Sequence, residues 1–260
     1  MFSTNPFAEL SASIDPAIMQ TYVIVMILCV VLGTLFDIIH KKSAKYFFAN
    51  WRNAQQKGSH QVGGGEIVSL AVQTAVVEVA TSGEFCNPQR RFAHLLTMYG
   101  FIAYVVATVA MVFGYETSAA TPAIWPALWT LGALLVCVGG YWFWFFIRVD
   151  VAAEGSSPFR FMRADLFIVS LLSSTTFGLI WAFLQATGAG GTTIFLGLYI
   201  IATTILFGGI PWSKFSHMFF KPAAALQKRV ENANGSRSNL PEPADKPETL
   251  GSARTLPRHY

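Results

Sequence analysis

Five long apolar runs constrain what this chain can fold into. Each is nearly free of charged residues, and they cover residues 19–39, 95–113, 124–147, 166–184 and 193–210. A helix that crosses a bilayer of about 30 Å of hydrocarbon needs about 20 such residues. Only 12% of the 260 residues are charged, which is roughly half the share in soluble domains. The sequence therefore predicts an all-α integral membrane protein with five transmembrane helices.

The positions of the basic residues predict the orientation of these helices. All 18 Lys and Arg residues lie between the first and second runs, between the third and fourth, or after the fifth. Cytoplasmic loops carry the excess of Lys and Arg, so we expect the N-terminus outside and the C-terminus inside. The expected location is a bacterial-type inner (cytoplasmic) membrane. Because topology accounts for the net charge of +4, we expect membrane lipid and no nucleic acid among the partners.

The spans divide the chain into three expected parts. Residues 1–18 form an external N-terminal segment, residues 19–222 a five-helix membrane domain, and residues 223–260 a cytoplasmic, disordered tail that is rich in Pro, Ser and Asn. The first apolar run is not a cleaved signal peptide, because no Lys or Arg precedes it.

The long loop between the first two spans contains one further helical pattern. Residues 66–80 carry apolar side chains at helical spacing, namely Ile67, Leu70, Ala71 and Val77. The spacing predicts a short cytoplasmic amphipathic helix, which lies on the membrane surface or against a partner.

Two histidines stand out among the polar residues of the spans. His94 opens the second span and His217 follows the fifth, so both imidazoles are expected at the same depth near the inner surface. Two helices of a bundle can hold a planar cofactor in this way, and Arg91 and Lys214 are placed to meet the propionates of a b-type haem. The alternative is that each histidine anchors its helix at the lipid headgroups. The three cysteines have no iron–sulfur or zinc spacing, so no cluster is expected in this chain.

The segments around these histidines resemble a known family. Residues 91–94 (Arg-Phe-Ala-His) followed by 98–101 (Met-Tyr-Gly-Phe) are similar to the second span of the nitrate reductase gamma-subunit family of membrane cytochromes b. Residues 211–219, with Pro222 behind them, resemble the end of that family's fifth span. Its relatives include heterodisulfide-reductase-like membrane subunits and the anchors associated with dissimilatory adenylylsulfate (APS) reductase.

The resemblance implies electron transfer between quinone and a cytoplasmic redox enzyme. It makes His94 and His217 the axial ligands of the iron of an inner haem b. The positions of the second, outer haem hold Tyr104 and Tyr199 instead of histidine, so zero or one haem is expected, not two. The expected partner is an iron–sulfur or flavin oxidoreductase, with APS reductase of sulfur metabolism as the first choice.

Three functions compete at this point. The first is a membrane anchor and electron-transfer subunit, itself non-catalytic or quinone-reactive, in which Tyr99 and Asp165 are candidates for quinone contact. For Asp165, an interfacial ion pair with Arg163 is the alternative. The second function is a cofactor-free structural anchor that docks a partner. The third is a transporter, which is disfavoured because five spans do not form two equal halves.

Overall fold

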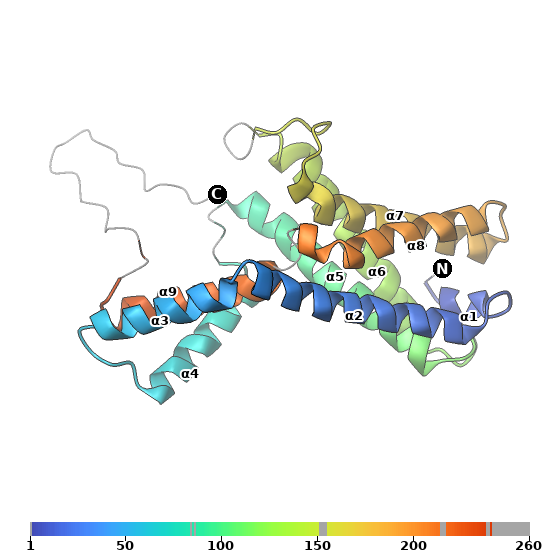
Figure 1. Cartoon of the computed structure of the whole chain (residues 1–260). Helices are drawn as coiled ribbons and strands as arrows, with labels where there is room; N and C mark the ends of the chain where they lie inside the picture. Colours follow the sequence, from blue (N-terminus) through green and yellow to red (C-terminus); the bar gives the residue numbers. More distant parts are fainter. Residues whose placement is uncertain are drawn as a thin grey trace. The chain divides into compact units, whose positions relative to one another are not determined.

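The computed structural model describes residues 2–83, 85, 87–150, 155–213, 217–237 and 240, and for His217 the backbone only. The described residues form helices and turns and contain no strand (Figure 1). In chain order the α-helices are α1 (Pro6–Leu10), α2 (Pro16–His40), α3 (Ser43–Lys57), α4 (Gly64–Gln73), α5 (Pro88–Gly114), α6 (Ile124–Trp142), α7 (Leu166–Thr187), α8 (Thr192–Gly208) and α9 (His217–Ala233). Two π-helical segments continue α4 and α6, η1 (Thr74–Ala80) and η2 (Phe143–Ile147).

Four helical segments are long and apolar enough to cross a membrane. They are Pro16–His40, Pro88–Gly114, Ile124–Ile147 and Arg163–Thr187, and their length and apolarity fit a multi-pass membrane protein. The fifth apolar helix, α8, has 17 residues, or about 26 Å at 1.5 Å per residue, at the short end of the range for a span. Its crossing of the membrane, and the orientation of all the spans, stay predictions.

The chain divides into two compact units. The first, here called the apolar unit, consists of Met1–Phe36 and Phe92–Ser216, and the second, the polar unit, consists of Asp37–Arg91 and His217–Tyr260. The chain passes between the units three times, within α2, within α5 and between Ser216 and His217. Each unit has its own buried residues.

In the apolar unit, α5 and α6 approach each other closely at small residues. A Cβ atom added at Gly100 would lie 2.7 Å from the carbonyl oxygen of Gly132, and one added at Gly139 would lie 2.6 Å from the carbonyl oxygen of Ala93. The two contacts are seven residues apart on both helices. This repeat keeps one face of each helix against the other, and small residues there let two membrane helices pack backbone to backbone.

Hydroxyl groups link the remaining helices of the apolar unit. Ser174 of α7 and Thr203 of α8 share a buried hydrogen bond of 2.7 Å. The Tyr22 hydroxyl of α2 donates to the carbonyl of Ile200 at 3.1 Å and lies 3.0 Å from the Thr204 hydroxyl. Such interhelical hydrogen bonds are typical of helices that pack in lipid, because no water is available there to bond to polar groups.

The outward surface of α2 is apolar along its length. Its large exposed side chains are Ile18, Ile24, Val25, Ile27, Leu28, Val31, Leu32, Leu35, Phe36 and Ile39. A surface of this kind is compatible with contact to lipid tails.

Local chemistry places two helix ends away from the ends of the apolar runs. α5 begins at Pro88, seven residues before the expected run, because the Asn87 side chain accepts hydrogen bonds from the amides of Gln89 and Arg90. α8 ends at Gly208, and a 3-10 turn (Ile210–Trp212) follows, so Pro211 stands beyond the helix end and does not kink it.

Candidate functional site

His94 lies in the second turn of α5, half-buried and close to the contact with α6. Its neighbour Ala93 is buried and packs on Gly139, and Phe92 meets the ring of Trp142 edge-on with 5.9 Å between ring centres. The imidazole is therefore carried on a helix whose start is packed against α6 by the two residues before it.

The other three residues predicted for the haem site are only partly described. Arg91 donates from its Nε to the carbonyl of Thr81 at 2.7 Å, which ties the start of α5 to the end of η1. His217 is the first residue of α9, and its side chain lies outside the described residues, as does Lys214. His94 belongs to the apolar unit and His217 to the polar unit, so their pairing stays a prediction.

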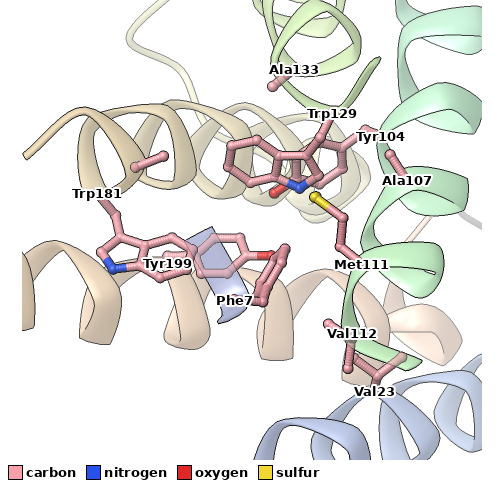
Figure 2. Packing of buried hydrophobic residues seen from close by; sticks show 11 residues of the cluster. Phe7, Val23, Tyr104, Ala107, Met111, Val112, Trp129, Ala133, Trp181 and Tyr199 are labelled. Carbon is pink, nitrogen blue, oxygen red and sulfur yellow. The ribbon is translucent and has the colours of Figure 1, made fainter. Parts of the chain in front are cut away.

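The two tyrosines that replace the second histidine pair meet in a closely packed cluster. Tyr104 of α5 and Tyr199 of α8 are both buried, and both lie beside Gly178 of α7: a Cβ added there would be 3.1 Å from the Tyr104 hydroxyl and 3.3 Å from the Tyr199 ring. Figure 2 shows these rings among those of Trp129, Trp181 and Phe7.

Aromatic rings cover both tyrosines directly. The Trp129 ring lies 5.1 Å from that of Tyr104 at an angle of 30°, and the Trp181 ring stacks on that of Tyr199 at 5.6 Å and 10°. A porphyrin needs an open apolar slot between facing helices. Since indole rings fill the space on these tyrosines, this position does not fit a haem.

The N-terminal segment completes this cluster, which the sequence did not indicate. Asn5 is fully buried, and its side-chain oxygen accepts from the amides of Phe7 and Ala8, which starts α1. Phe7 then points into the core, where its ring centre lies 6.0 Å from that of Trp129 and 5.5 Å from that of Trp181 (Figure 2). A single aromatic residue in a short segment gives no periodic pattern, so sequence reasoning could not detect it.

Asp165 forms a buried ion pair, with a different partner from the one expected. Its Oδ2 lies 2.6 Å from Nη2 of Arg148 and also accepts from the amide of Met162 at 2.8 Å. The alternative given above, an interfacial ion pair with Arg163, was right about an ion pair and wrong about the partner, because the Arg163 side chain is exposed while the carboxylate of Asp165 is buried. Of the two candidates for quinone contact, Asp165 is thus held by Arg148, while Tyr99 lies on the exposed side of α5.

Arg148 also holds the loop that follows it. Its guanidinium donates to the carbonyls of Ser157 at 3.0 Å and Arg160 at 2.8 Å, and its Cζ lies 4.1 Å from the centre of the Trp144 ring. We call this arrangement the Arg148 clamp. It presents Phe159 and Phe161 to the outside, 84% and 66% exposed.

Comparison with known proteins gives one related sequence. The chain is 28% identical over 163 residues to the citrate utilization protein B of Escherichia coli, which covers 60% of this chain and 41% of that protein. The chain thus spans about two-fifths of the length of the relative it matches. No protein-family model and no solved structure matches it.

Proposed function

We propose that this chain is a membrane anchor and electron-transfer subunit that links a cytoplasmic redox enzyme to the quinone pool. The observation that carries the proposal is the position of His94, half-buried near the start of an apolar helix and three residues after the pair Arg90 and Arg91. The proposed topology has five spans, with α8 as the fifth, the N-terminus outside and the C-terminus inside.

One b-type haem near the inner face is the proposed cofactor. His94 and His217 would hold its iron, and Arg91 and Lys214 would meet its propionates. The haem supplies one-electron transfer, and the chain supplies its ligands and its apolar surroundings. The packing of Trp129 on Tyr104 and of Trp181 on Tyr199 supports a count of one, because it leaves no slot at the outer position.

The proposed soluble partner is an iron–sulfur or flavin oxidoreductase. APS reductase is one candidate, supported by the resemblance of the two histidine segments. An enzyme of citrate utilization is the other, supported by the name of the relative that is 28% identical. For quinone we propose a contact at Tyr99, because its side chain is exposed on the surface of α5.

Replacing either histidine with alanine is expected to remove the haem. The measurement is a visible difference spectrum, reduced minus oxidised, of purified full-length protein, with reduction by a quinol under anaerobic conditions. His94→Ala and His217→Ala should both lose the b-type band, while the matched control His60→Ala, in an exposed position outside the spans, should keep it.

The Arg148 clamp favours a second candidate function, a cofactor-free anchor. Two exposed phenylalanines, on a described segment (residues 155–162) that Arg148 holds through the carbonyls of Ser157 and Arg160, are the kind of surface that docks a partner. The same spectrum separates the two. A band that is absent from wild type contradicts the haem proposal and leaves the docking function, whereas a band that persists in His94→Ala contradicts the assignment of His94 as a ligand.

A further inference from the structure

One side of α4 and η1 carries valine side chains that the described part of the chain does not cover. Val68, Val72 and Val76 recur every four residues and are 63%, 58% and 54% exposed. At 100° per residue they lie along one side of the helix. We call these three residues the valine stripe.

The opposite side of the same helix packs on α9. Thr74 is buried, and Glu78 forms an ion pair with Arg229 of α9, with 2.9 Å between Oε1 and Nη2. Of the four residues of the expected amphipathic pattern, Ile67, Leu70 and Ala71 are half-buried and share the Thr74 side by helical register. The fourth, Val77, is 42% exposed. The helix is thus apolar on two sides, and residues that the structure describes cover only one of them.

The helix that carries the valine stripe is held in a folded unit. Asn234, which follows α9, is fully buried; its side chain donates to the carbonyl of Ala54 in α3, and its carbonyl accepts from the amide and hydroxyl of Ser59. Because α3 and η1 are both bonded to the α9 segment, the exposure of the valines is a property of the folded unit.

The charge of the polar unit favours one kind of surface as the ligand of the stripe. Among its described residues, Lys and Arg outnumber Asp and Glu by eleven to four. A unit with a net positive charge and an apolar stripe matches a layer of anionic lipid headgroups over acyl chains.

The connections of this unit keep it near the membrane. Two residues separate α2 from α3, and seven residues separate η1 from α5. Fully extended, seven residues span at most roughly 30 Å. Both α2 and α5 are candidate membrane spans, so the valine stripe cannot leave the vicinity of the bilayer surface.

We infer that the valine stripe lies in the headgroup region of the leaflet at which α5 begins, with anionic lipid as its ligand. This inference rests on the membrane part of the proposed function and not on the haem.

Spin labels on the full-length chain test this inference. In a background with Cys29, Cys86 and Cys137 replaced by alanine, a nitroxide is attached at Val72→Cys or Val76→Cys. The matched control is Glu66→Cys, an exposed polar position on another side of the same helix. The protein is placed in vesicles of phosphatidylcholine with phosphatidylglycerol, and the accessibility of each label to oxygen and to a water-soluble nickel chelate is measured.

Labels on the valine stripe should be several-fold more accessible to oxygen than to the nickel chelate, and the Glu66 label should show the reverse. The preference should weaken in phosphatidylcholine alone. High accessibility of the stripe to the chelate places it in water, and low accessibility to both reagents places it against protein; either result overturns the inference. An equal oxygen preference without anionic lipid overturns the assignment of the ligand. The accessibility of these labels does not depend on haem. Failure of the redox proposal is therefore distinguishable from failure of this inference.

Discussion

Replacing Gly100 with leucine is expected to prevent the apolar unit from folding. The new Cβ would lie 2.7 Å from the Gly132 carbonyl oxygen, 2.8 Å from the Leu135 Cβ and 2.9 Å from the Val136 amide nitrogen. Two of these three contacts are with backbone, so α5 and α6 must separate along their length. Since overpacking of a flexible core already costs about 1–3 kcal/mol, a clash with backbone should exceed it. The readout is the monodisperse fraction of detergent-solubilised protein in size-exclusion chromatography.

The control for this substitution is Gly197→Leu. Gly197 also lies in an apolar helix, α8, and a Cβ added there meets no other atom within 4 Å. This variant should remain monodisperse, as wild type does. If Gly100→Leu gives the same profile as Gly197→Leu, the close contact of α5 with α6 is wrong.

Replacing Arg148 with methionine is expected to destabilise the protein strongly, although less than Gly100→Leu does. It leaves the carboxylate of Asp165 buried without its cation and removes two bonds to loop carbonyls. Loss of one partner of a buried ion pair costs about 3–5 kcal/mol, and for a chain of this size that lowers the melting temperature by on the order of 10 °C. Thermal unfolding in detergent, followed by circular dichroism, measures the effect.

Two further variants test whether Arg148→Met loses stability through the unpaired buried charge of Asp165 or through other lost contacts. Arg160→Met alters an exposed side chain that contributes only its backbone carbonyl to the clamp, so its melting temperature should stay near that of wild type. The double variant Arg148→Met with Asp165→Asn removes the unpaired charge and should regain part of the loss. A double variant no more stable than Arg148→Met alone would contradict an electrostatic origin.

Hydropathy alone predicted most of the helices. In lipid, the backbone N–H and C=O groups of a long apolar run must bond to each other, and a helix satisfies them all within one segment. The runs 124–147 and 166–184 match α6 with η2 and α7 within three residues. The helix around 66–80 was also expected, although its second apolar side was not. The start of α5 was placed seven residues late, since a cap made by Asn87 and Pro88 is polar and invisible to hydropathy.

The candidate site was less predictable than the fold. Sequence spacing placed an ion pair at Asp165 but chose the nearer Arg163, because only the folded loop brings Arg148, seventeen residues away, to the carboxylate. Tyr104 and Tyr199 were expected together, because they replace one pair of haem ligands. The rings that surround them, those of Trp129, Trp181 and Phe7, come from three other segments of the chain. Contacts between distant segments have no signature in a single sequence.

The central claim is that the chain holds one haem. The most direct measurement is the ratio of extracted haem b to protein in purified full-length chain, produced in cells with ample haem synthesis. The account predicts about one haem per chain, since the proposed ligands His94 and His217 would form one pair and the Tyr104–Tyr199 position is filled by rings. A ratio of zero would contradict the ligand assignment, and a ratio of two would contradict the packed outer position.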